Sequence, residues 1–496
     1  MVFSTTDSKS VIVVGGGVAG MSAACALAEA GLHVQLVERR GYLGGRASSY
    51  LHPGVREVID NCQHVLFGCC TNLLGFYRRI HVERQIHWTG SMTMIEPGGR
   101  RSYLGPSESG LFRLPAPLHG LASMLRADAF TLGDKIALGR AFSAMMRPAA
   151  MRSTESLDVW LKRHKQTEGT MTRFWRLVIA SALNAEIEAI AVPYAAKVIR
   201  ELFLNSAEAG KMGMSRVPLS SLYAGVTPFL EGRGGRVDLN KTVQSAEWDE
   251  STGRWNVETD AGPLAARFVV FALPFDAMGK LLSTLPKTIC DAETRSETVD
   301  RAHEQAGERQ ADQRARLAEQ IAQHVHWPIC SVHLWFDREI TDLEHAILLD
   351  REIHWMYNQS RLQTGRGGHY LELVVSASRS FAALPREAAI GVALKELGEF
   401  FPQVQQAHLE KVALVKEVRA TFGVPPGIDA ARPNAIAPWK NLFLGGDWTA
   451  TGWPSTMESA ARSGHLAAEA LLAKMGTPRT VLEPDLKPQG WMRWFS

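Results

Sequence analysis

The residues with the clearest chemical meaning form a glycine-rich turn directly after an apolar run near the start of the chain. The turn has the spacing GxGxxG, and an acidic residue follows about 20 positions later, as in dinucleotide-binding units. In such a turn the first glycine permits the sharp bend, the second lets a pyrophosphate approach the backbone, and the third lets the next helix pack on the strand, while the acid binds ribose hydroxyls. The predicted binding residues are Gly15, Gly17, Val18, Ala19, Gly20, Glu38 and Arg39.

A second pair of glycines stands just beyond the predicted second strand. Gly44 and Gly45 again allow a ligand to approach the backbone closely, and Arg46 supplies a fixed positive charge that suits a diphosphate. Enzymes that bind NAD lack this second element. The chain resembles the FAD-binding amine oxidases and carotenoid desaturases, whose fingerprint continues into a GGR segment, and this resemblance implies that FAD is the cofactor.

An apolar strand followed by glycines recurs near the other end of the chain, and a final helix is predicted to begin shortly after it. This region resembles the closing flavin motif of the same group. The resemblance implies that Asp447, next to Gly446, holds the ribityl or phosphate part of FAD, and that the backbone at Thr456 and Met457 meets the pyrimidine edge. Because residues 445–460 contain neither Cys nor His, non-covalent binding of FAD is expected.

The composition allows a large folded protein and argues against several classes of function. At 496 residues and 46% hydrophobic, the chain can bury a sizeable core in two or three domains. A net charge of +3, without basic runs interleaved with aromatic residues, does not indicate nucleic-acid binding. The six cysteines show no zinc-binding spacing, so we predict no metal and reduced, cytosolic thiols. The N-terminus does not resemble a signal peptide, and no apolar run approaches the roughly 18 to 20 residues that span a bilayer.

Strand-like patterns and flavin motifs gather in three separated blocks. We predict an α/β fold in which a three-layer, Rossmann-like FAD-binding domain is interleaved with a mostly helical or mixed substrate-binding domain. The predicted boundaries are 1–90, 225–285 and 412–475 for the FAD-binding domain, 91–224 and 286–411 for the substrate domain, about 289–323 for a charged helical insertion, and 476–496 for a C-terminal tail. In the middle block the resemblance implies that Val243 contacts the adenine; an ordinary core position in a strand is the alternative.

Two segments have the amphipathic pattern of helices that lie on a membrane surface. Residues 111–150 place Leu, Met and Phe at helical spacing with isolated Arg and Lys, which is typical of an amphipathic helix lying on lipid. The alternative is an ordinary helix that faces a core. Residues 491–495 are also amphipathic. We predict a cytoplasmic protein with peripheral contact at the inner face of the cell membrane.

The resemblance becomes more specific in residues 59–65, which read IDNCQHV. This segment is similar to the hydroxysqualene dehydroxylases, formerly called squalene-associated FAD-dependent desaturases, whose signature includes DNxQH. Further agreement lies in LPAPL at 114–118, ALN at 182–184, RVPLS at 216–220 and GDWTATGWPSTME at 446–458. The departures are Cys62, where glycine is usual, and the charged insertion. The resemblance implies that reduced FAD replaces the hydroxyl of hydroxysqualene by hydrogen, giving squalene for hopanoid synthesis, with an unknown electron donor.

Departure of an allylic hydroxyl as water requires an acid. Asp60 and His64 are the candidates, because related flavoproteins run this stretch of backbone past the isoalloxazine. A positioned acid contributes roughly 10² to 10⁴ in rate. His64 can donate and recover a proton near its ordinary pKa of about 6.5, although a purely structural histidine is the alternative. Asp60 needs a raised pKa, and otherwise it orients His64 or the ribityl chain. Asn61 and Gln63 are expected to be positioning groups.

Three other functions are compatible with parts of the sequence. A carotenoid or polyene desaturase would use the same scaffold in the opposite redox direction. An amine oxidase is less favoured, because residues 329–336 contain no lysine where that group commonly has one near the flavin. A lipid carrier without catalysis is also less favoured, since a purely apolar cavity gains nothing from burying the polar residues 60–64.

Overall fold

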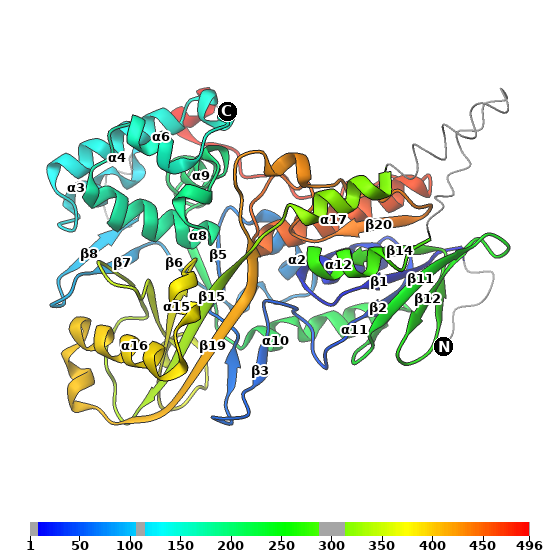
Figure 1. The fold of residues 1–496 in the computed structure, drawn as a ribbon, viewed down its shortest axis with the longest axis horizontal. Coiled ribbons are helices and arrows are strands. Elements are labelled where there is room, and N and C mark those ends of the chain that lie inside the picture. Colours follow the sequence, from blue (N-terminus) through cyan, green and yellow to red (C-terminus); the bar gives the residue numbers. More distant parts are fainter. Residues whose placement is uncertain (1–7, 106–114, 287–312, 496) are drawn as a thin grey trace.

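The computed structural model describes residues 8–105, 115–286 and 313–495. One part of it is built on a five-stranded parallel sheet with the order β10-β2-β1-β14-β20 (Figure 1). The strands are β1 (Ser10–Val14), β2 (His33–Val37), β10 (Arg236–Asp238), β14 (Phe268–Ala272) and β20 (Leu442–Gly445). They come from three stretches that are far apart in the sequence.

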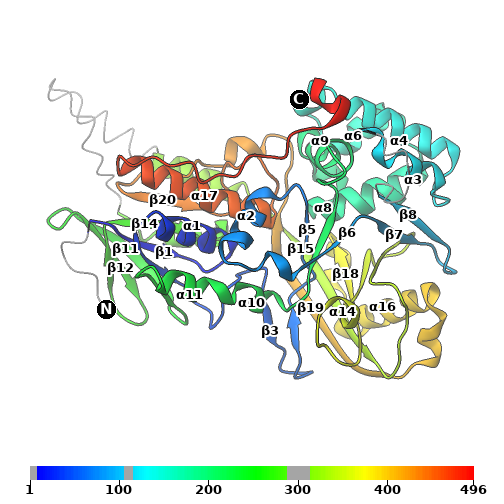
Figure 2. The same ribbon diagram turned by 180° about the vertical axis from the view of Figure 1, so that it is seen from behind.

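Alternating side chains of the central strand pack into different layers. Val11 and Val13 belong to the core formed with helices α1 (Val18–Glu29) and α17 (Met457–Lys474), which lie side by side (Figure 2). Ile12 and Val14 belong to the core on the opposite face, where an antiparallel sheet of β11 (Val243–Asp249), β12 (Arg254–Thr259) and β13 (Leu264–Ala266) packs. Helices, parallel sheet and antiparallel sheet therefore form three layers, and the predicted α/β fold is confirmed.

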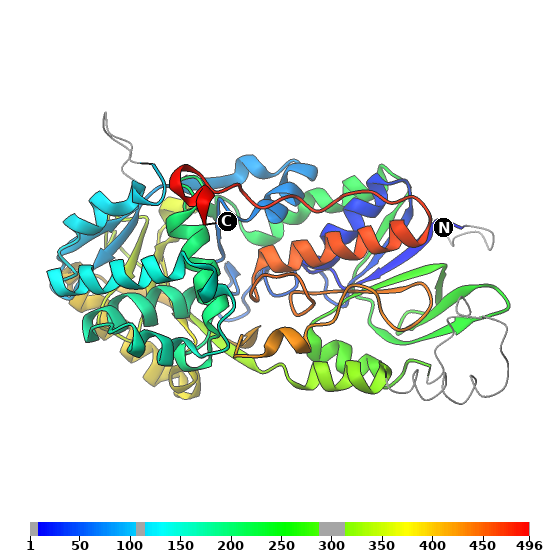
Figure 3. The same ribbon diagram turned by 90° about the horizontal axis from the view of Figure 1, so that it is seen from above.

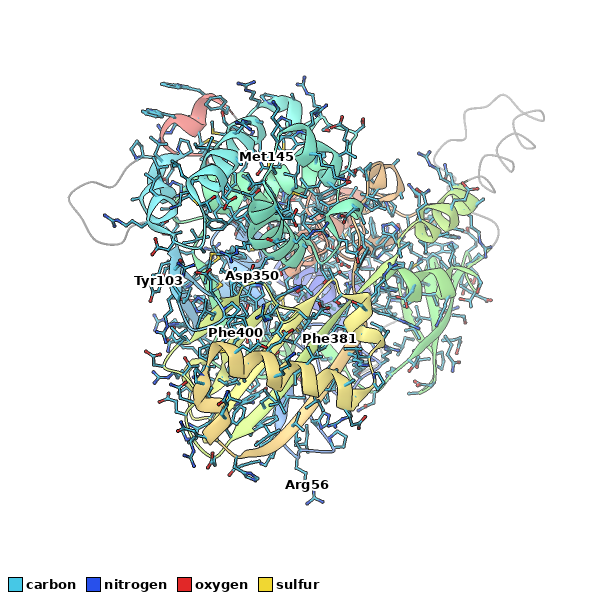
Figure 4. The ribbon with its side chains drawn as sticks, turned by 60° about the vertical axis from the view of Figure 1, so that its left-hand side comes forward. Arg56, Tyr103, Met145, Asp350, Phe381 and Phe400 are labelled. Atoms are coloured by element: carbon cyan, nitrogen blue, oxygen red, sulfur yellow. The ribbon has the colours of Figure 1, made fainter. Side chains whose placement is uncertain are left out.

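The other part is built on a seven-stranded mixed sheet with the order β19-β15-β18-β17-β16-β7-β8. The strands are β7 (Met92–Ile95), β8 (Arg101–Leu104), β15 (His326–Phe336), β16 (His345–Leu348), β17 (Trp355–Asn358), β18 (His369–Ser376) and β19 (Leu409–Phe422). Helices α15 (Arg379–Ala383) and α16 (Arg386–Phe400) cover one face, and their residues Phe381 and Phe400, labelled in Figure 4, belong to the core between them and the sheet. The long strands β15 and β19 extend toward the parallel sheet (Figure 1).

A helical cluster lies above this sheet in the view of Figure 1. Its elements are α3 (Leu121–Arg126), α4 (Leu132–Met145), α5 (Pro148–Met151), α6 (Leu157–Arg163), α7 (Glu168–Thr170), η3 (Met171–Ile179), α8 (Ala180–Leu183), η4 (Ile187–Ala189), α9 (Val192–Ile199) and η5 (Arg200–Leu204). Phe142, Phe174, Trp175 and Phe203 pack their rings together in its core. The elements η3 and η5 are π-helical, a geometry that is frequent at functional sites.

Short elements connect the two parts. Two small antiparallel sheets, β3-β4 and β5-β9-β6, carry the chain from the parallel sheet toward the seven-stranded sheet. The remaining elements are β3 (Ser49–Leu51), β4 (Val58–Asp60), β5 (Val65–Phe67), α2 (Thr71–Arg79), η1 (Glu83–Gln85), β6 (Ile86–Thr89), η2 (Leu118–Gly120), β9 (Met212–Ser215), α10 (Leu219–Leu222), η6 (Tyr223–Gly225), α11 (Val226–Glu231), α12 (Phe275–Leu282), α14 (Gln359–Leu362), η8 (Pro402–Gln406), η9 (Ile428–Ala431) and η10 (Gly490–Trp494).

The amphipathic stretch at 111–150 is not one helix. Residues 111–114 lie outside the described chain, and the remainder forms η2, α3, α4 and α5. In α4 the residues Ala137, Leu138, Ala141 and Met145 are buried, whereas Leu132 and Ile136 are 71% and 57% exposed. The helix therefore has a core-facing side, as the second interpretation expects, and an exposed apolar side whose contact with lipid stays a prediction.

The remaining predicted segments are only partly described. Most of the charged insertion at about 289–323 lies outside the described residues, and 313–322 are helical. The tail ends in η10, which lies beside the helical cluster (Figure 3), where Trp491 N–H donates to the Ala116 carbonyl. Within the described residues, no helix is both long enough and apolar enough to cross a membrane.

Candidate active site

The glycine-rich turn lies between the end of β1 and the start of α1. Gly15 has a φ of +108°, which strongly favours glycine, and its N–H donates to the Val37 carbonyl at 2.8 Å. A Cβ at Gly20 would overlap the carbonyl oxygen of Gly15. The turn can therefore close only with glycine at both positions, which leaves backbone N–H groups near the start of α1 for phosphates.

Glu38 lies against this turn. Its carboxylate accepts hydrogen bonds from Gly16 N–H at 2.7 Å and from Arg40 N–H at 2.8 Å. The side chain is buried and lines the cavity described below. This is the position that the sequence predicts for an acid that binds ribose hydroxyls.

The second glycine pair packs against the first turn. Gly44 and Gly45 have φ values of +115° and +61°, and a Cβ on Gly45 would come within 3.0 Å of the Cα of Gly17. Arg46 follows directly and forms an ion pair with Asp447 at 2.5 Å. The two glycine segments and the closing motif of the chain thus meet at one point.

Asp447 is buried at the end of β20. Its second oxygen accepts a hydrogen bond from Ser455 Oγ at 2.5 Å. Burial alone would raise the pKa of Asp447, but the Arg46 guanidinium and the Ser455 hydroxyl hold it below its usual range. The carboxylate therefore stays ionised and suits a hydroxyl-bearing ligand.

One cavity of about 730 Å³ joins all of these groups. Its predicted cofactor-binding residues are Gly15, Gly17, Val18, Ala19, Glu38, Arg39, Gly44, Gly45, Arg46, Val243, Gly446, Asp447, Thr456 and Met457. Gly20 does not line it and instead allows the close packing of α1. The glycine turns have no room for side chains, and acidic and basic groups line the same cavity. These features fit a dinucleotide cofactor of the FAD type.

The same cavity continues between the seven-stranded sheet and the helical cluster. Its walls there are mainly apolar and include Val178, Ala182, Phe203, Met212, Ile329, Trp355 and Val374. The sequence analysis did not identify these residues, because each looks like an ordinary core residue until the strands and helices are assembled. This part of the cavity suits a large apolar ligand.

The segment predicted to carry the chemistry divides into two groups. Asn61, Gln63 and His64 line the cavity, as does Cys62. Asp60 is not among the described residues that line the cavity. Its carboxylate accepts hydrogen bonds from Leu219 N–H and from Gln363 Nε2, each at 3.2 Å, and from Ser49 Oγ. Burial raises the pKa of Asp60. Its position suits the orienting role rather than direct proton transfer.

His64 is neutral in this environment. Its Nδ1 lies 2.7 Å from the carbonyl oxygen of Cys62, which can only accept, so Nδ1 carries the proton and Nε2 is an acceptor. Burial lowers the pKa of His64 to about 4. The ordinary value near 6.5 used in the sequence argument therefore does not apply here, because the imidazolium would lose its hydration.

Glu372 and Gln359 are two further residues that the sequence analysis missed. Glu372 Oε1 accepts a hydrogen bond from Gln63 N–H at 2.6 Å, and Gln359 Nε2 donates to the Gln63 side chain at 2.7 Å. Both belong to the seven-stranded sheet region, about 300 positions along the chain, and no local motif marks them. Within the described residues, no group of three or more His, Cys, Asp or Glu side chains could hold a metal ion.

The fold and the site together define an FAD-dependent oxidoreductase. The chain belongs to the flavin-containing amine oxidoreductase family, whose sequence pattern matches residues 18–472. This confirms the predicted superfamily, and FAD as the cofactor.

Related proteins of known sequence match nearly the whole chain. The 15-cis-phytoene desaturase of Synechococcus elongatus is 26% identical over 94% of this chain and 96% of its own length. A probable zeta-carotene desaturase of the same organism is 25% identical over 93% and 98%. Among solved structures, putrescine oxidase has a TM-score of 0.68 at 15% identity, covering 94% of this chain and 99% of its own. Cyclohexylamine oxidase of Brevibacterium oxydans has a TM-score of 0.62 at 17% identity, with the same coverages. These structures show the shared fold.

Proposed function

We propose that this protein uses FAD to transform a long-chain isoprenoid, and that its reaction is the reductive dehydroxylation of hydroxysqualene to squalene. The observation that carries the proposal is the position of residues 61–64. This segment, which resembles the hydroxysqualene dehydroxylase signature, lines the same cavity as the FAD-binding residues. The relatives named as phytoene and zeta-carotene desaturases support an isoprenoid substrate in general.

In this reaction the C–O bond of an allylic alcohol breaks, water leaves, and hydrogen takes the place of the hydroxyl. Reduced FAD, when bound, supplies the hydride, and we propose that it is held without a covalent bond. The protein must hold the hydrocarbon chain, exclude bulk water and supply one proton. The apolar walls around Phe203, Trp355 and Val374 suit the first two tasks.

The neutral His64 and a second group divide the work on the hydroxyl. His64 Nε2 accepts a hydrogen bond from the hydroxyl and orients it, and we assign the proton donor to Glu201. Burial raises the pKa of Glu201 despite the nearby Lys197, and its Oε2 accepts no hydrogen bond from the described residues. Other carboxylates that line the cavity, such as Asp447 and Glu458, already accept hydrogen bonds from several donors.

Desaturation of a polyene is the second candidate. The names of the relatives favour it, and so does the state of His64, since a neutral imidazole with a free Nε2 can accept the proton that desaturation releases. In that reaction bound FAD would supply the oxidant for loss of hydrogen from the hydrocarbon. The two candidates therefore differ in the direction of electron flow.

An anaerobic single-turnover experiment separates them. Enzyme reduced with dithionite is mixed with hydroxysqualene, and flavin absorbance and squalene are followed together; in parallel, oxidised enzyme is mixed with phytoene. Squalene formed in step with flavin reoxidation supports dehydroxylation. Flavin reduction with a more unsaturated product, and no squalene in the first arm, would replace it by desaturation.

The proton donor is tested in the same assay. Glu201→Gln is expected to slow squalene formation by roughly 10² or more, because it removes the proton but keeps the shape of the side chain. Glu208→Gln is the matched control, since Glu208 is exposed and pairs with Lys211. An unchanged rate in Glu201→Gln would assign the proton to another group.

We also propose that the protein meets the cytoplasmic face of a membrane through one surface of the helical cluster. Leu121 and Leu125 of α3 and Leu132 and Ile136 of α4 are exposed, each pair at helical i, i+4 spacing. The two helices are tied together where Lys135 Nζ donates to the Leu125 carbonyl at 2.8 Å. Exposed apolar side chains on two neighbouring helices are suited to a lipid surface that supplies an isoprenoid.

A further inference from the structure

Glu372 is a carboxyl group in the middle of an apolar sheet. It lies on β18 between Leu371 and Leu373, has no exposed surface, and is paired across the strands with His333 of β15 and Tyr357 of β17. Burial of a carboxyl group is unfavourable unless hydrogen bonds compensate for the lost water. The position of its partners therefore indicates what this side chain does.

The two hydrogen-bond partners of Glu372, Gln63 and Gln359, connect it to the segment 61–64 that lines the cofactor cavity. Glu372 Oε1 accepts from Gln63 N–H at 2.6 Å, and its Oε2 accepts from Gln359 Nε2 at 2.7 Å. The same Gln359 nitrogen donates to Gln63 Oε1 at 2.7 Å. Gln63 and His64 line the cavity, whereas Glu372 is not among the described residues that do. Glu372 therefore lies one layer behind the wall that faces FAD.

Residues 61–64 depend on such contacts because they lie between β4 and β5 and belong to neither strand. Asn61 N–H donates to the Ser48 carbonyl at 3.0 Å, and Ser331 Oγ donates to the Asn61 carbonyl at 3.1 Å. The bond from Gln63 N–H to Glu372 is the corresponding anchor for the second half of the segment. Loss of this anchor would free the backbone next to His64.

The charged and titratable groups around Glu372 come from several elements. They are Asp60 of β4, Cys62, His333 of β15, Tyr357 of β17, and Arg366 and Tyr370 next to or within β18. Burial, followed by the neighbouring Asp60, raises the pKa of Glu372 to about 8, and the hydrogen bonds from Gln359 and Gln63 only partly oppose this. Burial also lowers the pKa of His333 to about 3, so that ring is neutral.

We propose that Glu372 is a positioning residue whose carboxyl group anchors Gln63 against the cofactor cavity, and that protonation of this carboxyl group keeps a negative charge away from reduced FAD. When Glu372 ionises, a buried negative charge appears behind the flavin-facing segment. Such a charge opposes electron uptake and therefore lowers the reduction potential of bound FAD. The inference rests on FAD binding and is independent of which isoprenoid is the substrate.

The test is the midpoint potential of bound FAD between about pH 6 and 9.5, measured without substrate on wild type, Glu372→Gln and Glu410→Gln. Glu410 is an exposed glutamate on the nearby strand β19 and serves as the control. The potentials of wild type and Glu372→Gln are expected to run parallel near neutral pH. Above about pH 8 the wild type is expected to fall further, by at least a tenfold change in the reduction equilibrium, and the control to follow the wild type.

Two results would overturn the proposal. One is a pH dependence of the potential that is the same in wild type and Glu372→Gln. The other is a midpoint potential of the wild type that changes with pH at one constant slope between pH 7 and 9.5. This second result does not depend on whether the Glu372→Gln variant folds. Neither result depends on turnover, so failure of this inference is distinguishable from failure of the proposed dehydroxylation.

Discussion

The two walls of the cavity are held in different ways. On the cofactor side, Gly15, Gly20 and Glu38 form a turn whose main contacts lie close together in the sequence. On the opposite side, residues 61–64 are held by Ser48 and also by three partners 270, 296 and 309 positions away, namely Ser331, Gln359 and Glu372. The glycine turn is a local structure that many chains can form, although the Arg46–Asp447 pair on the same wall joins positions 401 apart. The support of residues 61–64 exists only when the seven-stranded sheet is assembled.

This difference predicts two kinds of failure. A larger residue in the glycine turn should prevent FAD from binding, because its side chain would need space that backbone atoms already occupy. A change in residues 61–64 or their supports should leave FAD in place and alter reactivity. A single substitution that causes both loss of FAD and altered reactivity would show that the two walls depend on each other more than their contacts indicate.

The largest effect is expected for Gly20→Val. A Cβ at this position overlaps the Gly15 carbonyl, which is backbone and cannot move aside cheaply. We expect folded protein to lack FAD, or folding to fail, as measured by the flavin-to-protein absorbance ratio and the thermal unfolding midpoint. Gly139→Ala is the control, because a Cβ there meets no atom within 4 Å. Stoichiometric FAD in Gly20→Val would contradict this account.

The next effect is expected for His64→Leu. The substitution removes the Nε2 acceptor that orients the hydroxyl while leaving the glycine turns untouched, so the single-turnover rate should fall by roughly 10² with FAD content unchanged. His408→Leu, at an exposed position, is the control. Loss of FAD together with activity would show that the segment supports the cofactor as much as the reaction.

The ionisation of His64 gives this prediction a pH test. Because its pKa is lowered to about 4, His64 stays neutral down to mildly acidic pH, and the rate should show no inflection from it near pH 6.5. The folded state binds fewer protons than the unfolded state between about pH 6.5 and 4, so this histidine reduces stability as pH falls through that range. His64→Leu should therefore lose less stability on acidification than wild type, in thermal scans from pH 7 to 4.5.

A smaller effect is expected for Asp447→Asn. The substitution removes the carboxylate that pairs with Arg46 at 2.5 Å but keeps a side chain able to contact Ser455. We expect about a tenfold weaker Kd for FAD, which corresponds to about 1.4 kcal/mol, measured by fluorescence titration of apoprotein. Asp337→Asn, which removes an ion pair in an exposed position, should leave the Kd unchanged. An unaltered Kd in Asp447→Asn would mean that Asp447 serves Arg46 rather than the cofactor.

The smallest effect on the isolated protein is expected on the outer surface of α4. Leu132→Ser combined with Ile136→Ser should change the free energy of unfolding by no more than about 0.5 kcal/mol per site, because both side chains are exposed. The same variant should bind anionic vesicles more weakly in co-sedimentation, while turnover of detergent-dispersed substrate is kept. Equal vesicle binding by variant and wild type would remove this surface from the proposed membrane contact.

The sequence predicted the parts of the site that are local. The spacing of Gly15, Gly17 and Gly20 predicted a dinucleotide-binding turn, the resemblance of the second glycine segment implied FAD, and the strand-like blocks predicted the α/β fold; FAD and the fold are confirmed. The same reasoning could not distinguish Asp60 from His64, four positions apart in one motif, although His64 lines the cavity and Asp60 does not. It also gave His64 its ordinary pKa, since burial is a property of the assembled sheets and not of the motif.

By itself, the sequence determined a dinucleotide-binding turn, because glycine at fixed spacing constrains the backbone within a few residues. Only the tertiary structure decided the protonation of His64, the burial of Asp60 and the presence of Glu372 behind Gln63. These properties depend on desolvation and on hydrogen bonds between segments about 300 positions apart. No local pattern of residues records such contacts, because they arise when strands from distant parts of the chain pair in one sheet.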